Sequence, residues 1–127
     1  MVGDGPDSKV YKNLVKDKDL NDVVIFLGAK QNPYPYFKIS DCVVLTSDYE
    51  GYPVVFIESY LFNKPIITTK VSDYEDIENR CGLVTEKDVK DIYEKMKSFI
   101  DDGYEIKSSF NPEDYNKKIL DKIEKLF

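Results

Sequence analysis

Histidine and tryptophan are absent from this 127-residue sequence, and cysteine occurs only at positions 42 and 81. Histidine is the commonest general base and metal ligand, so any chemistry here relies on carboxylates, hydroxyls, lysines or backbone groups. Two cysteines without histidine argue against a disulfide framework or a metal site. We therefore expect Cys42 and Cys81 to be reduced residues of the core.

Long apolar runs and basic clusters are missing as well. No stretch of about eighteen apolar residues and no signal peptide occurs, so neither a membrane span nor secretion is indicated, and a cytoplasmic location is expected. A net charge of −6 without a basic run argues against nucleic acid and against an anionic membrane surface as partners. The hydrophobic content of 42% and charged content of 33% fit a single domain spanning residues 1–127.

Short apolar runs alternate with helical patterns along the chain. Buried strands are predicted at residues 23–27, 42–45, 65–69 and 82–84, and helices at 7–20, around Phe37, and from Pro53, Ser72, Thr85 and Asn111. This alternation predicts an α/β fold, a Rossmann-like parallel sheet with helices on both faces. The loops after residues 27, 45 and 69 then share one carboxyl edge, where such folds bind ligands.

Local patterns give finer expectations for three of the helices. Pro53 suits the first helical position, and Ser72 and Thr85 are expected to cap the helices that follow them. Two apolar faces are predicted to point toward the core: Val54, Val55, Ile57, Leu61 and Phe62 in the first of these helices, and Val89, Ile92, Tyr93, Met96, Phe99 and Ile100 in the last.

The stretch from Asp48 to Glu58 is the candidate site. The N–H groups of Val54 and Val55 would be unpaired in the first helical turn, beside the positive end of the helix dipole, which suits an anion. Glu50 and Glu58 bracket these groups, and Gly51 permits close approach of a ligand. The alternative is an ordinary strand–helix connection with solvated carboxylates. The residues themselves leave both interpretations open.

Glu50 and Glu58 stand eight residues apart, the spacing of the E-x7-E motif of family 4 glycosyltransferases. Further segments match that family's consecutive motifs in order: VIFLG at 24–28, DCVVLTS at 41–47, EG at 50–51, IES at 57–59, NKPII at 63–67 and GLV at 82–84. The sequence therefore resembles a retaining glycosyltransferase of the two-domain GT-B fold over nearly its whole length. In that family, a motif like VGDGP, here at residues 2–6, follows a complete hydrophobic strand that begins several residues earlier. The chain is therefore expected to be a fragment: a truncated C-terminal half that lacks the acceptor domain and the first strand–helix unit.

The resemblance implies a role for each matched residue. Glu50 would be the catalytic carboxylate, lying beside the donor sugar, and Glu58 would accept hydrogen bonds from the ribose hydroxyls. The remaining positions, assigned to binding of the donor, are Gly51, Tyr52, Pro53, Val54, Val55, Gly28, Asn32 and Tyr34. Tyr34 either stacks on the nucleotide base or caps the packing of its loop.

The implied activity is transfer of a sugar from a UDP- or GDP-sugar, with retention and without a required metal, to a glycan or lipid-linked acceptor bound by the missing domain. Polysaccharide biosynthesis is the expected context. Because basic residues of the family's site precede this fragment, the chain alone should be inactive and bind nucleotide at about millimolar concentration. The alternatives are a nucleotide-sugar epimerase of GT-B architecture and a non-catalytic α/β interaction module.

Overall fold

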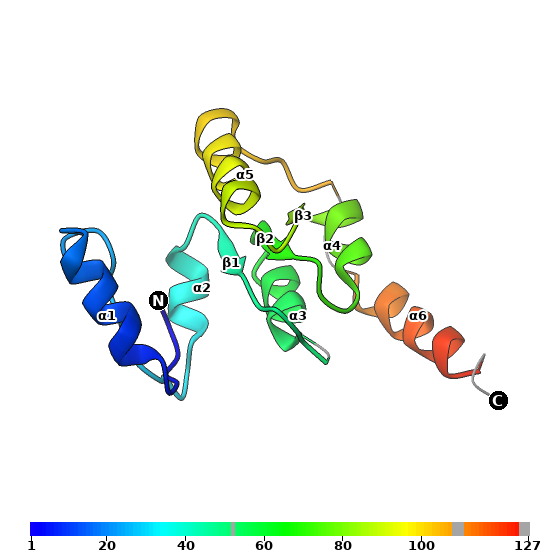
Figure 1. The fold of residues 1–127 in the computed structure, drawn as a ribbon. Coiled ribbons are helices and arrows are strands. Elements are labelled where there is room, and N and C mark those ends of the chain that lie inside the picture. Colours follow the sequence, from blue (N-terminus) through cyan, green and yellow to red (C-terminus); the bar gives the residue numbers. More distant parts are fainter. Residues whose placement is uncertain (52, 108–110, 125–127) are drawn as a thin grey trace. The chain divides into compact units, whose positions relative to one another are not determined.

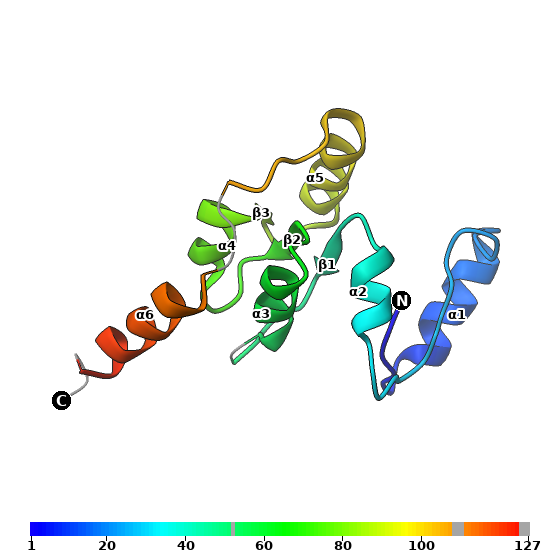
Figure 2. The same ribbon diagram turned by 180° about the vertical axis from the view of Figure 1, so that it is seen from behind.

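The computed structural model describes residues 1–51, 53–107 and 111–124 (Figure 1). The chain divides into two units, Met1–Tyr36 and Phe37–Phe127. The boundary falls within the short helix α2, Tyr34–Ile39, which confirms the helix predicted around Phe37. Figure 2 shows the same elements from behind.

The first unit holds helix α1, Ser8–Asp17, within the predicted range 7–20. The predicted strand at 23–27 is wrong: this segment has no strand structure, and Val23 and Ile25 are 75% and 63% exposed. Its backbone bonds run to the start of the chain, from Leu27 N–H to the Met1 carbonyl at 2.9 Å and from Gly3 N–H to the Gly28 carbonyl at 2.9 Å. Within this unit, these residues form isolated backbone hydrogen bonds and not the continuous ladder of a β-sheet.

The second unit is built on a three-stranded parallel sheet. Strands β1 (Val43–Leu45), β2 (Ile66–Thr69) and β3 (Gly82–Thr85) lie side by side in that order, with Val43 opposite Ile66 and Ile66 opposite Gly82. Four helices accompany them: α3 (Val54–Leu61), α4 (Tyr74–Arg80), α5 (Val89–Asp102) and α6 (Pro112–Glu124). Figures 1 and 2 both show α3 on one face of the sheet and α5 on the other. The predicted Rossmann-like α/β fold is confirmed.

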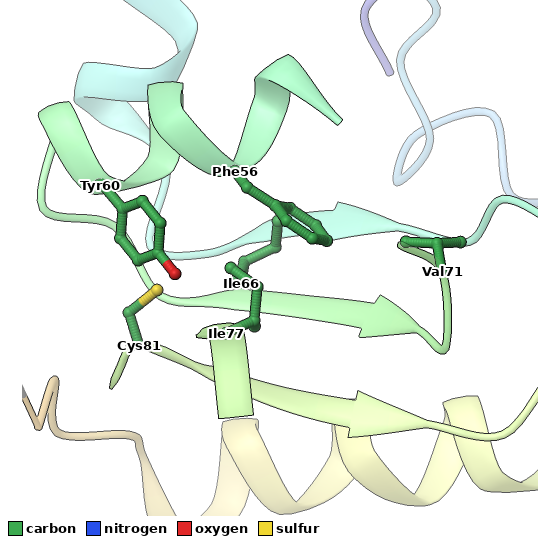
Figure 3. Packing of buried hydrophobic residues seen from close by; sticks show 6 residues of the cluster. All are labelled: Phe56, Tyr60, Ile66, Val71, Ile77 and Cys81. Atoms are coloured by element: carbon green, nitrogen blue, oxygen red, sulfur yellow. The ribbon is translucent and has the colours of Figure 1, made fainter. Parts of the chain in front are cut away.

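The core lies between the sheet and helices α3 and α4. All four residues of the central strand β2 are buried, as the continuous apolar run predicts. Figure 3 shows the side chains that pack together there: Phe56, Tyr60, Ile66, Val71, Ile77 and Cys81. Strand β1 has only one neighbour in the described sheet, and Val44 is 44% exposed, so the full burial predicted for 42–45 is wrong.

Both cysteines are free, as expected, and Cys81 is 2% exposed. Burial raises the pKa of the Cys81 thiol to about 12 and that of the Cys42 thiol, which is half-buried, to about 11. The Tyr60 hydroxyl is directed toward the Cys81 sulfur in Figure 3. Both thiols therefore stay protonated at neutral pH. Cys81 belongs to the core as predicted, whereas Cys42 is only half-buried and lies outside the core cluster.

Gly82, the first residue of β3, is the point of closest approach in the core. A Cβ atom there would lie 2.4 Å from the Ile66 carbonyl oxygen and 2.3 Å from Cγ2 of Ile77. Because Ile66 is 1% exposed and Ile77 is fully buried, neither has open space to move into. Only glycine lets α4 and β2 pack this closely on β3.

Helix α3 presents a different face to the core from the one predicted. Phe56, Ser59 and Tyr60 are buried, whereas Val54 and Leu61 are each 60% exposed; of the predicted face, Val55 packs against the core. All residues of α3 except Glu58 and Ser59 are apolar or aromatic, so periodicity in the sequence could not identify the buried side.

The end of α3 is closed by a left-handed residue. Asn63 has φ of 52°, its N–H donates to the Tyr60 carbonyl at 3.0 Å, and Lys64 N–H donates to the Ser59 carbonyl at 2.8 Å. These two bonds form a Schellman motif, which ends the helix and leads the chain directly into β2.

The caps predicted for the later helices are wrong. Asp73, not Ser72, precedes α4, and its side chain makes no cap hydrogen bond. Thr85 is the last residue of β3, and Asp88 caps α5 by accepting from the N–H groups of Lys90 and Asp91. Of the stripe predicted to face the core from α5, Val89, Tyr93 and Ile100 are 83%, 62% and 76% exposed, and α5 has no buried residue.

Candidate functional site

The carboxyl edge of the sheet is formed by the segments that follow β1, β2 and β3. In a parallel sheet all strands end at the same edge, so these segments are neighbours although they are far apart in sequence. The first carries Ser47, Asp48 and Glu50 and leads into α3; the second carries Lys70 and Ser72; the third carries Glu86 and Lys87. The predicted catalytic carboxylate is therefore at the ligand-binding edge of the fold.

Glu50 is half-buried and held at two points. Its carboxylate accepts a hydrogen bond from the Ser47 hydroxyl, with 2.6 Å between Oε1 and Oγ. Its main-chain carbonyl accepts another from the Ser72 hydroxyl at 2.8 Å. One contact thus orients the side chain, and the other fixes the backbone that carries it.

Two further contacts tie down the loop after β1. The buried Thr69 hydroxyl donates to the Ser47 carbonyl at 2.5 Å, and the Lys87 ammonium donates to the Asp48 carbonyl. No sequence motif assigns this anchoring role to Ser47, Ser72, Thr69 or Lys87. The signal that could have found them is topological, because each lies within three residues of the end of a strand in a parallel sheet.

A second cationic group, Lys70, is paired at this edge. Its ammonium group contacts the Glu86 carboxylate, and this hydrogen bond raises the pKa of Lys70 from its ordinary value. Lys70 N–H also donates to the Thr85 carbonyl at 3.2 Å. These bonds join the segment after β2 to the segment after β3, so all three loops of the edge are linked to one another.

The first turn of α3 offers free N–H groups. Pro53 is the cap of the helix (φ −76°, ψ 96°), one position earlier than predicted, and its carbonyl accepts from Phe56 N–H at 2.9 Å. Among the residues that the structure describes, nothing accepts a hydrogen bond from the N–H of Val54 or Val55. The Val54 side chain is 60% exposed, so this end of the helix is partly open to solvent. This arrangement suits a negatively charged ligand.

Gly51 and Glu58 both lie outside the packed core. Gly51 is exposed, and a Cβ atom there would meet nothing within 4 Å. Glu58 is half-buried and shares its side of α3 with Val54 and Leu61, four residues before and three after, which are exposed. Glu58 is therefore on a partly exposed side of the helix. Tyr52 lies outside the described residues.

The other three predicted binding residues belong to the first unit. Gly28 has φ of +69° with no atom within 4 Å of a Cβ placed there. The Asn32 side chain accepts from Tyr34 N–H at 3.1 Å and so caps α2, and Tyr34 is 46% exposed. The structure thus brings Glu50, Gly51, Pro53, Val54 and Val55 together around the start of α3, with Glu58 in the same helix, and describes Gly28, Asn32 and Tyr34 in their own unit.

A parallel sheet with helices on both faces, and with a glutamate held at the carboxyl edge beside the start of a helix, defines the chain as a Rossmann-like α/β protein. The sequence profile of the family described as Glycosyl transferases group 1 matches residues 1–120. The chain belongs to this family.

Relatives in three organisms illustrate its range. Identity is 32% over 77 residues with the N-acetyl-alpha-D-glucosaminyl L-malate synthase of Bacillus anthracis, covering 61% of this chain and 20% of the relative. An uncharacterized glycosyltransferase of Methanocaldococcus jannaschii is 35% identical over 69 residues, which cover 54% of this chain and 17% of the relative. Identity is 25% over 127 residues with an N-acetylgalactosaminyltransferase of Campylobacter jejuni that acts on a diphospho-undecaprenol compound, covering 97% of this chain and 35% of that one.

Two solved structures share the fold. The apo form of the lipopolysaccharide outer core galactosyltransferase WaaB matches with a TM-score of 0.74 at 18% identity, over 95% of this chain and 40% of that one. The sucrose-phosphate synthase of Thermosynechococcus elongatus matches with a TM-score of 0.69 at 24% identity, over 80% and 29%. The chain thus spans 17% to 35% of the lengths of these three curated relatives. Within the described residues, no helix has the length and apolar character needed to cross a bilayer.

Proposed function

We propose that this chain is the donor-binding, C-terminal domain of a retaining glycosyltransferase and that its donor is a UDP- or GDP-sugar. The observation that carries the proposal is Glu50: it is fixed by Ser47 and Ser72 at the carboxyl edge of the sheet, where the free N–H groups of α3 begin. Membership of the glycosyl transferases group 1 family supports a transferase over an epimerase or a non-catalytic module.

In the proposed reaction, the bond between the anomeric carbon of the sugar and the diphosphate oxygen breaks. The acceptor hydroxyl forms the new bond at that carbon with the same configuration, and its proton leaves with the nucleoside diphosphate. Glu50 lies beside the donor sugar and stabilises the positive charge that develops at the anomeric carbon. Glu58 accepts hydrogen bonds from the ribose hydroxyls, and Gly51 leaves room for the sugar. The proposed reaction requires no tightly bound metal ion.

The diphosphate is bound by the start of α3. Each charge-assisted hydrogen bond from Val54 or Val55 N–H contributes roughly 1.5–3 kcal/mol, and the helix dipole adds up to ~1 kcal/mol. This gain does not offset desolvation of a diphosphate together with repulsion by Glu50. The proposed full-length protein supplies the missing positive charge and the acceptor domain. Binding to the chain alone is therefore about millimolar.

Two-dimensional NMR of the ¹⁵N-labelled chain, titrated with UDP and with GDP, tests the donor site. We expect shifts at the amides of Gly51, Val54, Val55 and Glu58, stronger for the nucleotide that the enzyme uses. Glu58→Ala abolishes them, whereas the exposed control Glu105→Ala leaves them unchanged. Shifts confined to α5 or α6, or shifts that survive Glu58→Ala, contradict the assignment.

Product stereochemistry tests the reaction separately. With the full-length protein and the nucleotide sugar selected by the titration, the anomeric proton of the product is followed by ¹H NMR at early times. An anomeric configuration equal to that of the donor is expected. Inversion at the anomeric carbon would refute the proposed mechanism while leaving the donor site intact.

A further inference from the structure

We infer that Ser47 and Ser72 are positioning residues for Glu50, and that Ser72 does so across two loops. The inference rests on the proposed function, because it assigns these serines a role in the reaction of the same site. Neither serine belongs to the E-x7-E pattern, and neither is expected to touch the donor. Their effect is exerted through the position of the glutamate.

The Ser47 hydroxyl acts on the carboxylate itself. Glu50 is half-buried, and Oε1 accepts from Ser47 Oγ at 2.6 Å, which favours one orientation of the side chain. Ser47 is in turn fixed, because its carbonyl accepts from Thr69 Oγ1 at 2.5 Å and Thr69 is 2% exposed. The carboxylate is therefore connected through Ser47 to the end of the central strand.

The Ser72 hydroxyl acts on the backbone of the same loop. It belongs to the segment between β2 and α4, yet donates to the Glu50 carbonyl at 2.8 Å, 22 residues away in sequence. Ser72 is exposed and makes no cap bond to α4, so its hydroxyl is committed to the neighbouring loop. The two serines hold Glu50 from opposite ends of the residue, one at the side chain and one at the main chain.

Such a link matters because a misplacement of about 1 Å in a reacting group can lower the rate about 100-fold. A glutamate on a loop has many rotamers, and the loop can move as a whole. The structure restricts both motions with two hydroxyl groups. Their removal should loosen Glu50 without changing the groups proposed to bind the nucleotide.

The first measurement uses the chain without any ligand. Backbone ¹⁵N relaxation is recorded for Glu50 and Gly51 in the wild type, in Ser47→Ala and in Ser72→Ala, with Ser98→Ala as the matched control. Ser98 lies on α5 and contacts only Asp102, at 3.5 Å, among the hydrogen bonds of the described residues. We expect order parameters near 0.85 in the wild type and the control, and below about 0.6 in Ser72→Ala. Ser72→Thr, which keeps the hydroxyl, should restore the wild-type values.

The second measurement uses the full-length protein and the release of UDP or GDP from a panel of nucleotide sugars. For Ser47→Ala and Ser72→Ala, kcat should fall about 10- to 100-fold, while the donor KM changes less than about 3-fold. Ser72→Thr should recover most of kcat, and Ser98→Ala should match the wild type.

The outcomes separate the two proposals. Unchanged order parameters in Ser72→Ala overturn the positioning role of Ser72, and a wild-type kcat in Ser47→Ala overturns that of Ser47. If Glu50 becomes mobile in Ser72→Ala while kcat is unchanged, the positioning of Glu50 is not important for the reaction. A wild-type protein that releases no nucleotide from any donor overturns the proposed function and, with it, the role of the serines in transfer, whereas the relaxation data still report whether they hold the loop.

Discussion

The packing at Gly82 allows a stability experiment with a calculable outcome. In Gly82→Ala, the added methyl would lie 2.4 Å from the Ile66 carbonyl oxygen and 2.3 Å and 2.9 Å from Cγ2 of Ile77 and of Ile66. The two isoleucine side chains are buried, and the Ile66 oxygen belongs to the main chain of the central strand, where Ile66 N–H donates to the Cys81 carbonyl at 3.0 Å. Relief therefore requires separating β3 from β2. Overpacking of a core costs about 1–3 kcal/mol, and displacement of backbone places this variant at or above the upper end.

Urea denaturation of the chain, followed by circular dichroism, measures this loss directly. Gly51→Ala and Gly5→Ala are matched controls, since nothing lies within 4 Å of a Cβ at either position and neither residue has a positive φ. Both should lie within about 0.5 kcal/mol of the wild type or slightly above it. Combining Gly82→Ala with Ile77→Leu removes one methyl contact but leaves the carbonyl contact, so rescue should be partial. If Gly82→Ala is as stable as the controls, the close approach of α4 and β2 to β3 is not a feature of the folded protein.

Three smaller perturbations test other contacts in the same denaturation assay. Asp88→Ala should lower the free energy of unfolding by about 1 kcal/mol because the N-cap of α5 is lost, whereas Asp88→Asn should be close to the wild type. Equal stability of the wild type and both variants would contradict the cap. Asn63→Gly should equal or exceed the wild type, and Asn63→Ala should lose about 1 kcal/mol, since φ there is 52°. Burial raises the pKa of Cys81 in the folded state from its ordinary 9.0 to about 12, so its contribution to stability is complete below pH 9 and is lost as pH rises toward 12. The free energy of unfolding then falls by up to about 1.4 kcal/mol per pH unit. Between pH 8 and pH 10.5, Cys81→Ala should lose less stability than the wild type. An identical loss in both proteins would contradict the burial of the thiol.

The sequence predicts all three strands of the sheet to within one residue at either end, at 42–45, 65–69 and 82–84. They can be recognised because strands of a parallel sheet form short apolar runs between turn residues. The run at 23–27 has the same composition but no strand structure, since strand formation needs a partner that composition does not specify. The sequence predicts the position of a helix along the chain more reliably than which side of the helix is buried. A helix as uniformly apolar as α3 carries no periodic signal for its buried side, and the face is decided by the packing of Phe56 and Tyr60 on the sheet.

The candidate site divides in a similar way. Glu50, Gly51, Val54 and Val55 all lie within residues 50–55, so a sequence motif can locate them. The contacts that fix Glu50 come from Ser47 and from Ser72, the latter 22 residues away. Ser72 was interpreted as a helix cap because serine before a helix most often plays that part. Its actual partner depends on which loops lie side by side, and that is a property of the sheet topology.

The loop after β1 is anchored through its main chain as well as through Glu50. Thr69, Lys87 and Ser72 donate to the carbonyl groups of residues 47, 48 and 50, respectively, and every amino acid carries such a group. The side chains at positions 48 and 49 are exposed, Tyr49 to 83%, and these anchoring bonds do not involve them. Sequence diversification at 48 and 49 can therefore proceed without loosening the glutamate next to them. If the proposed function holds, these two positions are suited to a library that varies the surroundings of Glu50, because the bonds that anchor the loop do not depend on the side chains there.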